Sequence, residues 1–234
     1  MQHSLLRRII VGLVTGLFIF GSMSPMVVMT QQAQAHEVAN LSVVRQTVWL
    51  LVTESGSGSA VVLGPGLAVT AGHVVEGSES VQLIRPADGT EVNAIVVKAE
   101  LSEANDIAIL KPEFGIFPGP YAPVRADIPA QDEVVVSIGF PVPNQVGGTQ
   151  IATFGNYQDY QKNGNFALIT SPTAWGNSGG GTFDAQGRLI GLTIALAGVP
   201  GRGVIFHLVA IYRADAILDF INKHWRLTPQ TQRR

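Results

Sequence analysis

The sequence predicts an all-β protein whose strands fall into two sets of six, followed by one C-terminal helix. From residue 43 onward, short apolar runs rich in Val and Ile are interrupted by Gly, Pro, Asn and Asp, which is typical of strands joined by turns. The stretch 112–129 contains five prolines and cannot continue a hydrogen-bonded ladder, so it separates the two sets. After residue 208 the apolar spacing becomes helical.

The individual elements follow from this pattern in chain order. The first half, about 45–111, has six candidate strands at 47–53, 60–63, 67–70, 81–85, 92–99 and 107–111. The second half, about 130–208, has candidates at 134–139, 150–155, 166–170, 180–183, 189–197 and 204–208. Apolar residues at helical spacing predict a helix over 209–224, and the polar tail 226–234 is expected to fray.

The first 35 residues have the layout of a secretory signal peptide. Arg7 and Arg8 precede an apolar run at 9–20, and the small residues at 33–35 suit a signal peptidase. The run is shorter than the roughly 20 residues that span a bilayer, so we expect cleavage and no membrane contact afterwards. Two alternatives stay open: an uncleaved membrane tether extended by 21–29, and a twin-arginine signal.

Composition excludes several classes of protein. With 46% hydrophobic and 14% charged residues the chain can build a folded core. Its net charge of −2 gives no basic excess with which to bind nucleic acid. The absence of cysteine excludes disulfides, a thiol nucleophile and cysteine-ligated metal sites.

The strongest chemical motif is WGNSGG at 175–180, a serine among glycines before an apolar strand. Glycines allow positive φ angles and close approach to a ligand, so this turn can present the Ser178 hydroxyl while neighbouring N–H groups point outward. A nucleophilic serine needs such donors, because its attack on a carbonyl creates an oxyanion. The alternative is an ordinary surface turn, in which Asn, Ser and Gly are common.

Two other motifs carry groups that could activate a serine. The strand at 67–70 leads into a small-residue turn ending at His73, and imidazole is well suited to take a proton from a hydroxyl near neutral pH. Asp106 opens an apolar strand, where a partly desolvated carboxylate needs a partner such as an imidazolium. The alternatives are a histidine without a partner and an aspartate that caps a turn.

The three motifs together, TAGHV at 70–74, DIAIL at 106–110 and GNSGG at 176–180, resemble the trypsin-like serine proteases over nearly all of the chain after residue 35. Their short spacings and the GSGS run at 56–59 resemble most the protease domain of the HtrA/Deg group. The resemblance implies a protease domain at 36–225, built from two six-stranded antiparallel β-barrels with the site between them.

The resemblance also implies a role for each site residue. Ser178 would be the nucleophile, His73 the general base and then acid, and Asp106 the group that orients His73. The backbone N–H groups of Gly176 and Ser178 would form the oxyanion hole, and no metal or organic cofactor is needed. An uncharged residue is expected before the scissile bond, because the implied substrate-binding residues and the loop 197–203 are small or apolar: Pro172, Leu192, Thr193 and Ile194.

Expected partners and location come from the same resemblance. The substrate would be an unfolded or extended polypeptide, and the location periplasmic or extracellular, in a bacterial envelope. HtrA/Deg proteins usually carry a PDZ domain, for which only 226–234 remains after the helix. The segment 36–44 matches the family's trimer-forming segment loosely, so monomer and trimer stay open. The alternative function is a catalytically inactive, peptide-binding version of the same fold.

Overall fold

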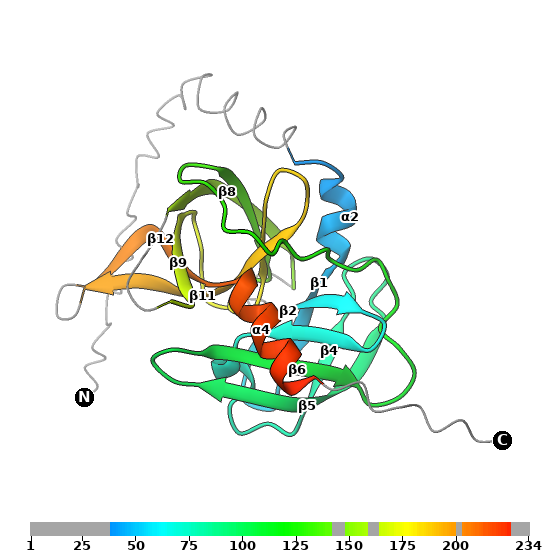
Figure 1. Ribbon diagram of the computed structural model, residues 1–234. Helices are drawn as coiled ribbons and strands as arrows, with labels where there is room; N and C mark the ends of the chain where they lie inside the picture. Colours follow the sequence, from blue (N-terminus) through cyan, green and yellow to red (C-terminus); the bar gives the residue numbers. More distant parts are fainter. Residues whose placement is uncertain (1–37, 142–147, 159–163, 200–202, 226–234) are drawn as a thin grey trace, which may run out of the picture.

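The computed structural model describes residues 38–141, 148–158, 164–199 and 203–225. Their strands close into two six-stranded antiparallel β-barrels, and one helix follows the second barrel (Figure 1). The predicted fold class is confirmed. The predicted signal peptide, the tail 226–234 and part of the loop 197–203 lie outside the described residues.

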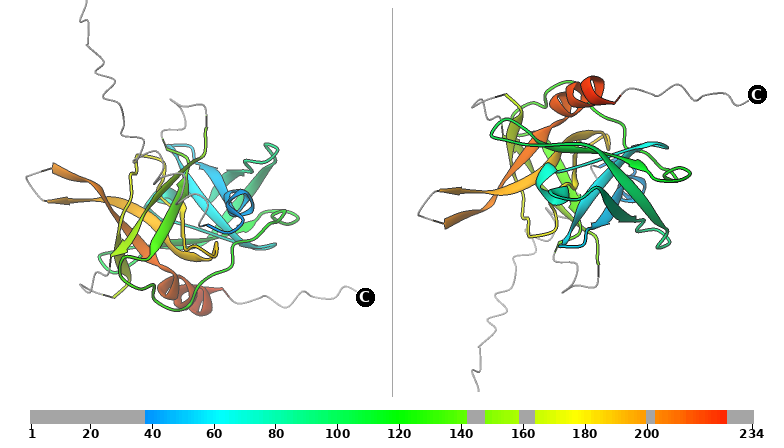
Figure 2. Two further views of the ribbon diagram at one scale, coloured as in Figure 1. Left: turned by 90° about the horizontal axis from the view of Figure 1, so that it is seen from above. Right: turned by 90° about the horizontal axis from the view of Figure 1, so that it is seen from below.

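The two barrels have the same strand order. In the first, strands β1 to β6 are, in chain order, Val48–Val52, Ser57–Gly64, Leu67–Thr70, Ser80–Ile84, Glu91–Leu101 and Asp106–Pro112. In the second, β7 to β12 are Val134–Gly139, Ile151–Gln158, Phe166–Thr170, Gly181–Phe183, Leu189–Val199 and Gly203–Arg213. The sheets run β1-β2-β3-β6-β5-β4 and β7-β8-β9-β12-β11-β10, so corresponding first and fourth strands close each barrel. The far ends of β11 and β12 project from the second barrel as a hairpin (Figure 2).

Strand β6 shows why several strands are apolar on both faces. Ala108 and Leu110 point into the interior of the first barrel, whereas Ile107 and Ile109 point into a core that both barrels share. Alternate residues of a strand face opposite sides, so a strand buried on both sides reads as a continuous apolar run. The run DIAIL therefore positions Asp106 at one end of a strand that the packing holds rigidly.

The C-terminal helix α4 spans Ala214–His224 and seals the seam between the barrels (Figure 1). Ile217 and Phe220 are buried in the shared core. The prediction of a helix from residue 209 was wrong in its start, because β12 continues to Arg213 and its residues 209–212 pair with β9. The apolar residues at 209 and 211 are compatible with a helix and with a strand, and pairing with β9 makes this segment a strand.

Two short helices were not predicted. Helix α2, Leu41–Gln46, packs Val44 into the shared core just before β1. A 3-10 helix, η1, spans Gly72–Val75 and follows β3. Within the described part of the chain, no helix has the length and apolar character needed to cross a membrane.

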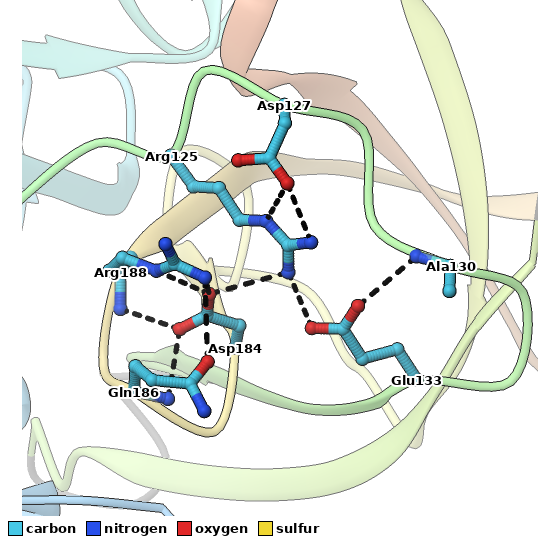
Figure 3. A network of polar contacts seen from close by, with 7 residues as sticks. All are labelled: Arg125, Asp127, Ala130, Glu133, Asp184, Gln186 and Arg188. Carbon is cyan, nitrogen blue, oxygen red and sulfur yellow. Dashed lines mark hydrogen bonds and ion pairs between the residues drawn. The ribbon is translucent and has the colours of Figure 1, made fainter.

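A polar network attaches the segment between the barrels to the second barrel (Figure 3). Arg125 donates hydrogen bonds to Asp127, to Glu133 and, at 3.4 Å, to the fully buried Asp184. The Asp184 carboxylate also accepts hydrogen bonds from the Arg188 side chain at 2.8 Å and from its backbone N–H at 2.9 Å. The buried charge is thus paired with two cations, as a desolvated carboxylate requires.

Candidate active site

The first barrel brings His73 and Asp106 together through strand pairing. β3 and β6 are antiparallel neighbours, with Thr70 opposite Ala108, so the end of β3 lies beside the start of β6. His73 sits in η1 directly after β3, and Asp106 is the first residue of β6. The two segments pack closely: a Cβ on Gly72 would lie 2.4 Å from the carbonyl oxygen of Glu100 and 3.2 Å from Asp106 Oδ1.

Both oxygens of Asp106 bind the same histidine. The backbone N–H of His73 donates to Oδ1 at 2.9 Å, and His73 Nδ1 lies 2.7 Å from Oδ2. Asp106 is only 6% exposed. A buried carboxylate at this distance holds the proton on Nδ1 and leaves Nε2 as the acceptor. The pair can therefore take a proton at Nε2.

The second barrel presents Ser178 on the loop between β9 and β10. The N–H of Asn177 donates to the carbonyl of Ala174 at 3.2 Å, and Gly176, the third residue of this turn, has a φ of 94°. A positive φ at the third position is the geometry of a type II turn and requires glycine. The sequence motif therefore forms the tight turn that was predicted.

Hydrogen bonds along this turn leave two N–H groups available. The amides of Asn177, Gly179 and Gly180 donate to the carbonyls of Ala174, Thr193 and Asn177, respectively. The N–H groups of Gly176 and Ser178 have no hydrogen-bond acceptor among the described residues. Two free backbone donors in the turn that carries a serine hydroxyl are the kind of groups that can stabilise an oxyanion.

The Ser178 hydroxyl has a different partner from the one a catalytic relay would use. In the described structure Ser178 Oγ donates to the carbonyl of Ile194 at 3.1 Å, and no hydrogen bond joins it to His73. Catalytic hydrogen bonds are often unformed before substrate binds. Rotation about one side-chain bond of Ser178 redirects the hydroxyl.

A pocket of about 640 Å³ brings these groups to one surface. It is lined by His73, Asp106, Gly176 and Ser178, and also by Thr193 and Ile194 of the predicted substrate-binding residues. Leu192 does not line it, because its side chain is fully buried in the shared core. Pro172 is exposed and also lies outside the lining.

Two parts of this pocket were missed by the sequence reasoning. Trp175, 84% exposed, lines the wall next to Gly176, and the turn between β1 and β2 contributes residues 53, 55, 56 and 57. An indole so exposed is unusual for a soluble protein, and its place in the WGNSGG motif could have indicated a ligand contact. Among the lining residues that the structure describes, only His73 and Asp106 carry ionisable side chains.

Metal binding has no structural support in the described ranges. They contain no group of three or more His, Cys, Asp or Glu side chains that could hold an ion.

The comparisons with solved structures agree with this two-barrel architecture. The HtrA-type protease AlgW with a tripeptide superimposes with a TM-score of 0.65 and 26% identity, over 82% of this chain and 64% of that one. The Rv3671c protease from M. tuberculosis in its active form gives 0.65 and 20%, over 81% and 85%. A serine endoprotease from Yersinia pestis gives 0.61 and 20%, over 82% and 65%. The fold is that of the trypsin-like proteases.

The sequence comparisons identify the family. The profile described as trypsin-like peptidase domain matches residues 58–192, which span more than half of the chain. The chain belongs to this family. A protein of Sinorhizobium fredii, y4bJ, described as uncharacterized, is 32% identical over 130 residues, which are 54% of this chain. The chain spans about a fifth of that relative's length, 20%.

Proposed function

We propose that the protein is an exported serine endopeptidase that hydrolyses extended or unfolded polypeptides. The observation that carries the proposal is the pair of amides at Gly176 and Ser178, free within the described structure, in the same pocket as the His73–Asp106 pair. One pocket thus combines a proton acceptor, a hydroxyl and donors for a developing negative charge. Membership of the trypsin-like peptidase family supports the same reaction.

In the proposed mechanism, Ser178 Oγ attacks the carbonyl carbon of the scissile bond and its proton passes to His73 Nε2. The amides of Gly176 and Ser178 donate to the oxyanion of the tetrahedral intermediate. His73 then gives the proton to the leaving amine, and an acyl-enzyme remains on Ser178. Water then attacks the acyl carbon while a proton passes to His73, and His73 returns that proton to Ser178 Oγ as the bond to Ser178 breaks and the acid leaves. Asp106 stabilises the imidazolium in both halves.

We expect the residue before the scissile bond to be uncharged, such as Val, Ala, Leu or Met. Thr173, Ala174 and Ile194 contribute no charge to the described lining, so a Lys or Arg side chain would find no counter-ion beyond the catalytic pair. The substrate backbone would pair beside Ile194, which the ladder between β11 and β12 skips at a bulge.

The decisive experiment is cleavage of a peptide library by the wild type and by Ser178→Ala. The wild type should hydrolyse peptides, and the variant should lose at least several hundredfold in kcat/KM. A fluorophosphonate, which reacts with activated serines, should label Ser178 in the folded protein. Absence of both cleavage and label would contradict the proposal.

The inactive peptide-binding alternative is favoured by one observation, the Ser178 hydroxyl bonded to the Ile194 carbonyl. In that case the wild type and Ser178→Ala would bind uncleaved peptides equally, and the label would be absent. Export has its own test, because sequencing the N-terminus of the protein made in cells should give a start near His36. A start at Met1 would indicate a membrane tether instead.

A further inference from the structure

Ser59 of the first barrel contacts the nucleophile turn of the second. It lies in β2 and is fully buried. Its backbone N–H donates to the carbonyl of Ser178 at 2.8 Å, and its hydroxyl donates to the carbonyl of Gly176 at 2.9 Å. One residue therefore binds the carbonyls of the same two residues whose amides are free in the described site.

These two contacts complete a set of restraints on the peptide groups around the oxyanion site. The peptide joining Gly176 to Asn177 is held by Ser59 at its carbonyl and by Ala174 at its N–H. The peptide joining Ser178 to Gly179 is held by Ser59 at its carbonyl and by Thr193 at its N–H. Each of the two peptide planes thus has one restraint from each barrel, which fixes its rotation.

The orientation of the Ser59 hydroxyl is itself determined. The buried N–H of Phe140 donates to Ser59 Oγ at 3.0 Å, so one lone pair is occupied and the proton is directed to the Gly176 carbonyl. Thr70 Oγ1 donates to the Ser59 carbonyl at 2.7 Å and fixes the backbone. Ser59 and the turn pack closely, since a Cβ on Gly179 would lie 2.2 Å from the carbonyl oxygen of Ser59.

We propose that Ser59 is a positioning residue for the oxyanion hole: it orients the peptide planes of the 176–179 turn so that the Gly176 and Ser178 amides face the substrate carbonyl. It acts through the turn and does not touch the substrate. The proposal rests on the proposed peptidase function, since the amides matter only if an oxyanion forms. Transition-state binding should therefore depend on the Ser59 hydroxyl, and ground-state binding should not.

The test is Ser59→Ala, which removes the hydroxyl and keeps the backbone N–H. A displacement of about 1 Å at a catalytic group can cost about 10²-fold, so kcat should fall about 10- to 100-fold with KM within about twofold. The affinity for a peptide aldehyde, whose adduct places an oxyanion in the hole, should weaken in parallel with kcat. In a Ser178→Ala background, Ser59→Ala should leave the affinity for uncleaved peptide unchanged.

A matched control is Ser137→Ala, which removes another buried hydroxyl from the second barrel. Ser137 Oγ lies 3.0 Å from Thr182 Oγ1, and among the described residues its hydroxyl makes no hydrogen bond to the turn and does not line the pocket. Both variants should melt at lower temperature than the wild type, and only Ser59→Ala should lose kcat at a temperature where both are folded. An equal loss of kcat in the two would overturn the proposal.

If Ser59→Ala does not fold, Ser59→Gly replaces it, because the smaller residue leaves room for a water that satisfies the buried Phe140 N–H but, not being attached to β2, does not hold the turn in place. Wild-type kcat in the folded variant would overturn the inference, and failure of both variants to fold would overturn it too by assigning Ser59 to stability alone. A wild type that neither cleaves peptides nor reacts with the fluorophosphonate would instead refute the peptidase function on which the inference rests.

Discussion

The two barrels share one strand order but hold their site residues in different ways. In the first, His73 and Asp106 belong to neighbouring strands of one sheet and bind each other directly. In the second, Ser178 lies on a loop between strands, and its turn is held by hydrogen bonds of which two come from the first barrel. The proton-accepting pair is held by contacts within one barrel, whereas the turn with the two free amides is held by contacts from both barrels.

The turn that carries Ser178 therefore depends on the packing between the barrels, and the His73–Asp106 pair does not. Loosening the seam should disturb the turn at 174–180 first and leave the His73–Asp106 bond in place. Gly179 shows the same dependence, because a Cβ there would lie 2.1 Å from Thr70 Oγ1 and 2.2 Å from the Ser59 carbonyl oxygen, both in the first barrel.

Asp106→Asn tests the pair in the first barrel. An amide that donates to Nδ1 stabilises the wrong imidazole tautomer, so kcat should fall by about 10⁴-fold with the fold intact. The measurement is kcat/KM on a library-derived peptide together with a circular dichroism spectrum. Asp88→Asn is the control, because Asp88 is exposed and pairs with Arg85, and neither residue lines the pocket. A loss below about tenfold in Asp106→Asn would refute the orienting role.

Gly176→Ala tests the turn in the second barrel. A side chain at a φ of 94° is strained, so the turn should relax and withdraw the Gly176 amide, which lowers kcat by about 10²-fold. The control is Gly77→Ala in the first barrel, where φ is 74° and no atom lies within 4 Å of the added Cβ. Both variants should lose about 1–2 kcal/mol of unfolding free energy. Comparable kcat losses in the two would contradict the contrast.

Trp175→Ala tests whether the exposed indole contributes substrate contacts. We expect about a tenfold fall in kcat/KM for peptides with aromatic or long aliphatic residues beside the scissile bond, equivalent to about 1.4 kcal/mol of lost apolar contact. Hydrolysis of a small activated ester should be unchanged. Phe114→Ala removes an aromatic side chain that is 81% exposed and does not line the pocket. It should behave as the wild type, and equal effects would assign Trp175 no contact.

Asp127→Asn should have the smallest effect, on stability in acid. The hydrogen bond from Arg125 holds the pKa of Asp127 below its ordinary value. A carboxyl whose pKa is lowered on folding stabilises the protein above its unfolded pKa, about 3.9, and loses this contribution as pH falls through the folded value. The melting temperature of Asp127→Asn should therefore be slightly lower than wild type at pH 7 and equal to it at pH 2. Glu113→Gln, an exposed residue for which the described structure gives no side-chain partner, is the control. A wild-type melting curve at both pH values would show that the Arg125 contact contributes nothing.

Much of the fold could be predicted because its signals are local. β3, β7 and β9 have the predicted bounds, since a short apolar run between turn residues specifies a strand over a few positions. The helix start at 209 was wrong because residues 209–213 fit two periods, and only the partner strand β9 decides between them.

The candidate site was predicted in part, for the same reason. His73, Asp106 and Ser178 were recognisable because each stands in a short motif, and all three line one pocket. The contact between Ser59 and Gly176 joins residues 117 positions apart, and the one between Ser59 and Phe140 joins residues 81 apart. No local pattern encodes such pairs, so only the folded chain shows which buried serine supports the turn. Leu192 was predicted to bind substrate because its strand runs beside the pocket. Its side chain instead faces the core, and the sequence pattern does not show which face of the strand it occupies.

The position of α4 at the end of the strands has a consequence for how the domain folds. Ile217 and Phe220 fill the core that both barrels share, yet they are synthesised after every strand. A chain that ended with β12 would leave apolar residues of the shared core exposed between the two barrels. Folding of the whole domain should thus require α4, and a chain truncated before residue 214 should be more sensitive to added protease than the full chain.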